Sequence, residues 1–200
     1  MFSTEAARKV ILLPGINSIL DVGSGKGEHA HMFATYNKQV YCVDIYDSKA
    51  NAYDHHRVKF VLSDFLSLEQ TFKVDCVWCS HILEHQPNVN IFLKKCLTFL
   101  NPGGYLAITV PPAKNDIVGG HLTMWNAGLV MYNLILAGTS CRNVMIRQYG
   151  YNLSVIVHYR PITLPDLKYD KGDIETLSQN FPERYGYQGF NGLIKSYQWT

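Results

Sequence analysis

The sequence predicts an α/β fold in which a mainly parallel β-sheet is covered by helices on both faces. Short apolar runs alternate with amphipathic runs of helical length, which is the pattern of βαβ units. A chain of 200 residues suits one domain, and 47% hydrophobic residues are enough to build its core. The low charged fraction of 17% disfavours long disordered stretches.

The first half of the chain contains most of the expected sheet. A helix over 28–36 follows the first apolar run, and a second helix over 88–100 has apolar residues at helical spacing. Asn101-Pro102-Gly103-Gly104 is expected to end that second helix. The expected strands of this half are 18–22, 39–43, 58–62, 74–79 and 105–110.

The second half changes character. A helix is expected over 125–137, and two strands, 143–149 and 152–159, are expected to form a hairpin through Gly150-Tyr151. The tail is rich in turn residues, with one short helix expected over 173–179. We therefore expect one domain over 1–160 and a C-terminal extension over 161–200 that packs on it.

Charge and apolar patterning exclude several classes of protein. A net charge of +2 without a Lys/Arg cluster argues against nucleic-acid binding. The longest apolar stretch, 129–137, is about half of what a membrane span needs, and no signal-peptide core is present. Cys76 and Cys79 form a CxxC within an expected strand, where they point to opposite faces and cannot bridge. We expect a cytoplasmic protein that is a monomer or homodimer and has no membrane contact.

A glycine-rich turn, Asp21-Val22-Gly23-Ser24-Gly25-Lys26-Gly27, closes the first strand and opens the first of these helices. Glycines at alternate positions allow positive φ and a close approach of a ligand to the backbone. The spacing is G-x-G-x-G, and Glu28 stands where the dinucleotide fingerprint has its last glycine. No G-K-S/T follows, so a phosphate loop is excluded. The turn suits a ligand without a diphosphate.

Acidic residues follow the next two strands. Asp44 can accept both hydroxyls of a ribose. Asp64 can accept from an adenine amino group, and Phe65 can cover a ring face. The alternative is that each acid caps a helix or turn. For Asp44 considered without the other residues, this alternative stays open. The combination of these acids with the glycine turn at one sheet edge favours a nucleoside site.

These motifs, together with His81-Ile82-Leu83-Glu84-His85 and Leu100-Asn101-Pro102-Gly103-Gly104, resemble the class I S-adenosylmethionine-dependent methyltransferases from about Ser18 to Pro112. The resemblance implies a Rossmann-like seven-stranded, mostly parallel sheet whose last strand is antiparallel. It implies S-adenosyl-L-methionine as the cofactor, with the glycines beneath its methionine part, Asp44 on the ribose and Asp64 at the adenine edge. The cofactor-binding residues expected on this basis are Asp21, Gly23, Ser24, Gly25, Gly27, Asp44, Ile45, Asp64, Phe65, Ser80 and His81.

Candidate catalytic residues lie beyond the fourth and fifth strands. If a helix begins near His81, then His81, Glu84 and His85 share one face, and His121 follows on the loop after the fifth strand. In one interpretation these residues only orient the helix and line the methionine pocket. In another, His85 or His121 is a general base toward a hydroxyl.

In the third interpretation, His81, Glu84, His85 and His121 bind a divalent ion, as in small groups of methyltransferases with E-x-x-E-H and a later His. His81 in place of their first Glu would favour Zn²⁺ over Mg²⁺. We assign no metal. Five aromatic residues were considered for the acceptor side: Trp125, Tyr132, Tyr149, Tyr151 and Tyr159.

The favoured hypothesis is a methyltransferase that acts on a small molecule or glycan, with O-methylation expected. Sugar methylation is suggested by the missing basic patch and by the numerous His and aromatic residues. Two alternatives stay open: a nicotinamide-dependent oxidoreductase on a similar sheet, and a non-catalytic domain that binds the cofactor. The sequence does not identify the acceptor.

Overall fold

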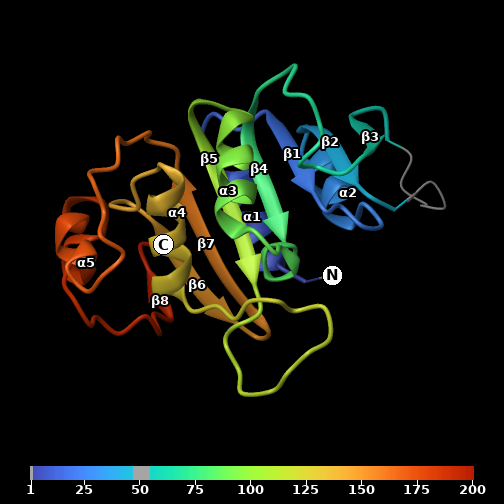
Figure 1. Ribbon diagram of the computed structural model, residues 1–200. Coiled ribbons are helices and arrows are strands. Elements are labelled where there is room, and N and C mark those ends of the chain that lie inside the picture. The colour runs from blue at the N-terminus through green and yellow to red at the C-terminus, as the bar shows by residue number, and fades with distance from the viewer. Residues whose placement is uncertain (1, 47–54) are drawn as a thin grey trace.

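In a computed structural model, which describes residues 2–46 and 55–200, a single sheet runs through the molecule (Figure 1). The described strands have the order β3-β2-β1-β4-β5-β7-β6-β8. β1 to β5 are mutually parallel, and β7 runs antiparallel to both of its neighbours. The strands are β1 (Ser18–Val22), β2 (Gln39–Asp44), β3 (Val58–Leu62), β4 (Val74–Ser80), β5 (Leu100–Val110), β6 (Met145–Tyr149), β7 (Asn152–His158) and β8 (Ser196–Tyr197).

Helices cover both faces of this sheet, as the sequence predicts. α3 (Val89–Thr98) and α4 (Ala127–Ala137) pack in front of it in Figure 1 and bury their apolar sides in the larger core. α1 (Thr4–Leu12) and α2 (Glu28–Thr35) pack on the other face, in a second core around Trp78. Cys76 belongs to this second core and Cys79 to the first, which confirms that the CxxC cysteines point to opposite faces.

Local sequence explains where the front helices begin and end. The side chain of Asn88 accepts a hydrogen bond from the backbone N–H of Ile91 (3.2 Å), and Asn126 caps α4 in the same way. Gly138, with φ of 108°, ends α4 in the left-handed conformation. A bridge between Pro112 and Trp125 places the start of α4 close to the carboxyl end of β5.

Three sequence-based expectations need correction. The Asn101–Gly104 segment lies inside β5 rather than between a helix and a strand, and a Cβ on Gly104 would come within 2.9 Å of Asp75 O. No α-helix begins at His81: this residue has φ of 54°, and only a 3₁₀ turn, Leu83–His85, follows it. α1 was not expected, although Ala6 and Val10 form its buried side.

The tail belongs to the same body as the sheet. Leu177, Phe181 and Ile194 are buried in the larger core. β8 pairs with β6 and adds one short strand beyond the seven expected. The short helix α5 (Asp173–Thr176) and the 3₁₀ turns Ser178–Asn180 and Glu183–Tyr185 complete the tail, so the expected helix over 173–179 is divided in two.

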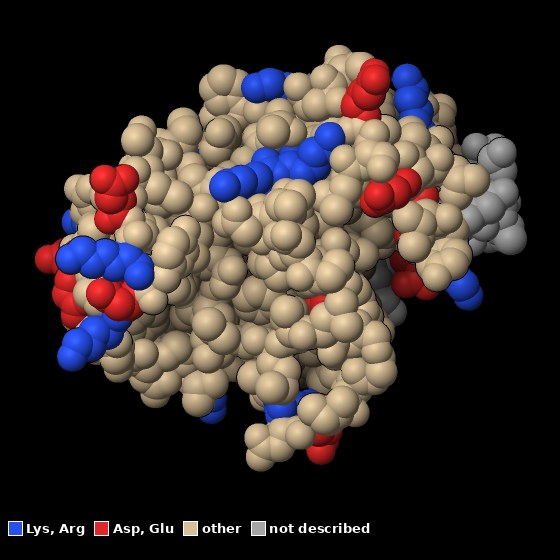
Figure 2. All heavy atoms as spheres, in the orientation of Figure 1, with Lys and Arg blue, Asp and Glu red and all other residues tan. Residues whose placement is uncertain are grey.

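No helix in the described part of the chain has the length and apolar character to cross a membrane. On the face shown in Figure 2, Lys and Arg side chains are interspersed with Asp and Glu on a mostly uncharged surface.

Candidate active site

The turn after β1 has the geometry that a ligand approaching backbone amides requires. Gly23, Gly25 and Gly27 have φ of 71°, 51° and 75°, a region that other residues rarely adopt. A Cβ on Gly23 would come within 2.8 Å of Ile82 Cδ1, whereas a Cβ on Gly25 would meet nothing within 4 Å. Gly25 therefore borders open space at the carboxyl edge of the sheet, where ligands of parallel α/β sheets bind.

Two carboxylates stand beside this turn. Asp44 accepts hydrogen bonds from the backbone N–H groups of Gly25 (2.8 Å) and Tyr46 (3.0 Å), so it clamps the turn from the neighbouring strand. Asp21 is 2% exposed, and its Oδ2 has no hydrogen-bond partner within the described structure. Burial and then the charge of Asp44 raise the pKa of Asp21 to about 7. An unpartnered buried carboxylate at this place suits a ligand that brings a donor or a positive charge.

The groups after β2 and β3 flank the same edge. Ile45 is 61% exposed and offers an apolar surface beyond Asp44. The carboxylate of Asp64 accepts a backbone N–H two residues on and a hydroxyl three residues on, which is the turn-capping role. The ring of Phe65 packs in the core against Phe92 and Phe99, at 5.4 Å and 5.6 Å between centroids. Phe65 is thus a core residue, and its expected stacking on a ligand ring loses its support.

A hollow of about 270 Å³ lies against the glycine turn. Gly23 and Ser24 line it from one strand end, and Ser80 and His81 line it from another. The N-terminal segment closes one side, because Phe2 also lines the hollow and lies 5.0 Å from the His81 ring. In Figure 1 the N-terminus accordingly lies at the edge where β4 and β5 end.

His81 is held from two sides. Its Nε2 lies 2.9 Å from Asn152 Oδ1, and its Nδ1 lies 3.3 Å from Glu84 Oε1. Burial alone lowers the pKa of His81, but Glu84 and Asn152 outweigh burial, so the pKa is raised. Both ring nitrogens face oxygen atoms, so these two contacts hold the His81 ring in one orientation. This arrangement suits a positioning group rather than a base.

Glu84, His85 and His121 form a cluster next to His81. Glu84 is 1% exposed, and its described contacts are with histidines, at 3.3 Å between Oε1 and His81 Nδ1 and 4.0 Å between Oε1 and His85 Nε2. His85 Nδ1 lies 2.7 Å from the carbonyl oxygen of Gly120. Since a carbonyl only accepts, Nδ1 carries a proton, and in the neutral form of the ring the lone pair is on Nε2. Nε2 lies 4.0 Å from Glu84 Oε1.

The side chains of this cluster could bind a cation, and they could also provide a general base. The ring of His121 lies 5.1 Å from that of His85, and one ligand atom each from Glu84, His85 and His121 lie within 4.8 Å of one another. A His that donates Nδ1–H to a carbonyl is also the arrangement that orients metal-bound imidazole. His81 contacts Glu84 but is not part of this set.

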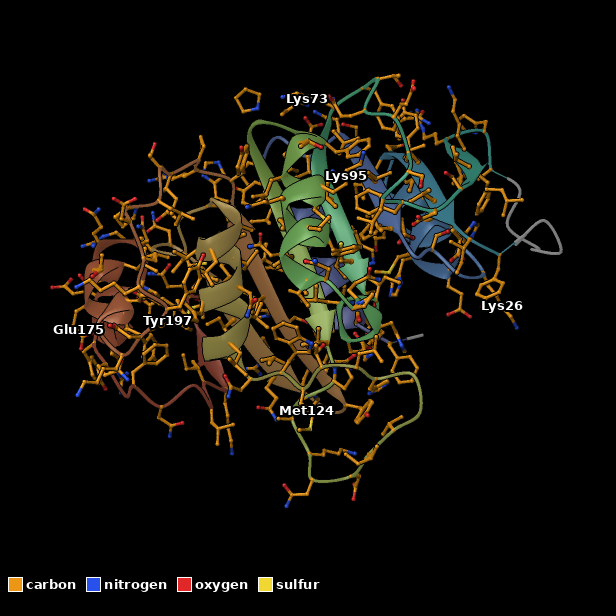
Figure 3. All side chains as sticks on the ribbon, in the orientation of Figure 1. Lys26, Lys73, Lys95, Met124, Glu175 and Tyr197 are labelled. Carbon is orange, nitrogen blue, oxygen red and sulfur yellow. The ribbon has the colours of Figure 1, made fainter. Side chains whose placement is uncertain are left out.

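A second hollow, of about 160 Å³, lies under the loop that connects β5 and α4. The loop is tied to the 3₁₀ turn by Leu122 N–H, which donates to Glu84 O at 2.8 Å. His121 and Met124 line this hollow, and Figure 3 shows Met124 on the loop at the lower edge of the molecule. Of the five aromatic residues considered for the acceptor side, Tyr151 lines the loop hollow and the other four do not: Trp125, Tyr132, Tyr149 and Tyr159.

The contacts of those four residues explain why. Trp125 is 3% exposed, and Tyr159 packs against the core. Tyr132 lines a different hollow, next to the tail. The hydroxyl of Tyr149 accepts Ala6 N–H and lies 3.1 Å from Ser154 Oγ.

Sequence reasoning missed Phe2, Asn152 and Lys114. Asn152 holds His81 across 71 positions of sequence, and no motif marks it. Phe2 precedes the first strand and belongs to no recognisable pattern. Lys114 lines the loop hollow, but a single Lys after two prolines carries no distinguishing spacing.

Comparison with known proteins identifies the class of fold. Residues 20–108 match the family model of a methyltransferase domain. A SAM-dependent methyltransferase from Archaeoglobus fulgidus superposes with a TM-score of 0.63 at 17% identity, over 77% of this chain and 92% of that one. The N-methyltransferase NodS from Bradyrhizobium japonicum WM9, solved with S-adenosyl-l-homocysteine, gives 0.59 at 16% identity, over 77% and 84%. Such low identities show a shared fold.

Over residues 20–108 the chain is similar to a methyltransferase domain, and it shares its fold with S-adenosylmethionine-dependent methyltransferases. A curated relative is the ubiquinone biosynthesis O-methyltransferase of Xanthomonas campestris pv. campestris (strain B100), 29% identical over 109 residues. The match spans 50% of this chain and 44% of that relative. The same-named protein of Xanthomonas oryzae pv. oryzae (strain PXO99A) is 30% identical over 46% of this chain and 41% of its own length. The chain thus matches less than half the length of these relatives.

The described residues fit the cofactor of this family, S-adenosylmethionine. Gly25 leaves open space where a Cβ would stand, and the unpartnered Asp21 Oδ2 lies beneath the turn. S-adenosylmethionine has an ammonium group, a sulfonium and ribose hydroxyls. It therefore offers hydrogen-bond donors and positive charge to the Asp21 carboxylate.

Proposed function

We propose that this chain transfers a methyl group from S-adenosylmethionine to a hydroxyl of a small molecule or glycan. The observation that carries the proposal is the glycine turn of a methyltransferase domain, clamped by Asp44 and open at Gly25. In this proposal Asp44 also accepts the ribose hydroxyls, and Asp21 receives positive charge from the amino-acid part. The nicotinamide-dependent alternative loses its basis, because the matched family is a methyltransferase domain.

The bound cofactor supplies a methyl group that is already activated by the positive charge on sulfur. The protein then has to align the acceptor and exclude water. His85 Nε2 accepts the hydroxyl proton of the acceptor, because Gly120 O fixes the proton on Nδ1. The buried carboxylate of Glu84, 4.0 Å away, stabilises the imidazolium that forms. His81, held by Asn152 and Glu84, lines the hollow at the glycine turn.

A second version of the site is favoured by the cluster geometry. Glu84, His85 and His121 would together hold a divalent ion. The buried carboxylate of Glu84 and the orienting contact of His85 to Gly120 both fit this role. Such an ion supplies a Lewis acid for an acceptor oxygen.

Binding and turnover test the proposal separately. S-adenosylhomocysteine should raise the melting temperature of the chain, whereas NAD should not. Replacement of Asp44 by Ala should remove this shift. An unchanged shift in Asp44→Ala, or a larger shift with NAD, would refute the assigned cofactor site.

His85→Ala tests the base. With a labelled methyl donor and a panel of hydroxylated metabolites, this variant should lose roughly 10²–10⁴-fold in turnover while its affinity for S-adenosylhomocysteine stays the same. His158→Ala, at the opposite end of β7, is the matched control. A chelator should leave the wild-type rate unchanged if His85 acts as a base alone. Loss of the rate in chelator and its recovery with Zn²⁺ or Mg²⁺ would favour the metal version.

A further inference from the structure

The loop hollow contains a cation, Lys114, that forms no ion pair with a carboxylate of the described residues. Lys114 lines this hollow, and its Nζ lies 4.4 Å from the centroid of the Tyr151 ring. None of the ion pairs found between described residues involves Lys114, although Asp116 lines the same hollow. An ammonium group held over an aromatic face keeps its N–H donors available to an anion.

Tyr151 places this cation beside the catalytic groups. Its ring lies 6.2 Å from that of His81, which lines the hollow at the glycine turn, with 14° between the two ring planes. Lys114 is positioned over the same ring, and His121 lines the loop hollow with it. The next residue, Asn152, is fixed by its contact with His81, which holds the hairpin tip in place.

The loop also offers an apolar surface. Ile117 is 88% exposed, Leu122 61% and Met124 57%, and all three line the hollow. Exposed apolar side chains gathered around a concave site mark a surface that a ligand covers. A neutral sugar would use neither this surface nor the free charge of Lys114.

We propose that the loop hollow binds an acceptor with a carboxylate on an apolar, hydroxyl-bearing frame, and that Lys114 on Tyr151 recognises the carboxylate. The inference rests on the proposed methyltransferase function. It narrows the acceptor from any small molecule or glycan to an anionic, largely apolar one.

Binding of two matched probes tests this inference on the full chain saturated with S-adenosylhomocysteine. Protocatechuate and its methyl ester share the same hydroxyls and ring, but only the first is charged. By isothermal titration calorimetry the acid should bind about tenfold more tightly than the ester, as a charge-assisted hydrogen bond predicts. Lys114→Ala should abolish this difference in affinity, because it weakens the binding of the acid alone. Lys114→Arg should preserve the difference. The control Lys94→Ala, on the exposed side of α3, should change neither affinity.

Three results would overturn the inference while the cofactor still binds: an acid that binds no more tightly than its ester, an equal loss of both probes in Lys114→Ala, or xylose binding more tightly than either probe. Failure of S-adenosylhomocysteine to bind would refute the proposed function itself, and this inference with it. The calorimetric titration of the cofactor product therefore distinguishes the two failures.

Discussion

Removal of the charge on Asp21 should make the protein more stable at high pH. The pKa of this carboxyl is raised from 3.8 to about 7 by burial and by Asp44. A raised folded-state pKa means that the folded chain binds the proton more tightly than the unfolded chain does. Stability is therefore lost as the pH rises from the unfolded pKa to the folded pKa. At about 1.36 kcal/mol per pKa unit, wild type should lose on the order of 2.5 kcal/mol between about pH 5 and about pH 8.

Asp21→Asn keeps the shape of the side chain and abolishes this titration. Urea unfolding without ligand, at about pH 5 and about pH 8, gives the free energy of unfolding of each variant. The pH-dependent loss should be smaller in Asp21→Asn than in wild type by on the order of 2.5 kcal/mol. Asp166→Asn, on the exposed tail, controls for the removal of a carboxylate. An equal pH dependence in wild type and Asp21→Asn would refute the reasoning.

Two further predictions concern residues around the proposed cofactor site. Gly25→Ala should lower the free energy of unfolding by about 1–2 kcal/mol, because residue 25 has a left-handed conformation. It should also weaken the binding of S-adenosylhomocysteine, measured by calorimetry, because the new methyl group enters the open space beside Gly25. An unaltered affinity would contradict the placement of the ligand there. Asn152→Ala should lower the pKa of His81, since it removes one of the two contacts that raise this pKa. Titration of the His81 ring by NMR measures the change, with His158→Ala for assignment and control, and an unmoved or higher pKa would contradict the contact's role.

The local pattern of the sequence was enough to predict the sheet and its turn. Five parallel strands, the two front helices and the hairpin at Gly150 lie within a few residues of their expected positions. This is possible because apolar periodicity and glycine or asparagine boundaries act over short stretches of chain. The turn at Gly23–Gly27 and the strand-end acid Asp44 were recognisable for the same reason, since a turn and a strand end are local features.

The roles of the individual site residues depended on contacts between distant segments. His81 appeared to begin a helix, but its left-handed φ breaks that helix, and Asn152 holds its ring. Phe65 looked like a ligand-stacking ring, but the neighbouring helix and strand give it core partners instead.

The sequence by itself determined the fold class, the resemblance to a methyltransferase family and the place of the glycine turn, because each follows from spacing within one segment. The assignment of His85 Nε2 as the free nitrogen and of Tyr151 as the platform for Lys114 came from the folded chain. The first assignment depends on the contact of the Gly120 carbonyl with the His85 ring, and the second depends on the position of Tyr151 at the loop hollow. Such contacts join residues far apart in sequence, and side-chain packing rather than local propensity determines them.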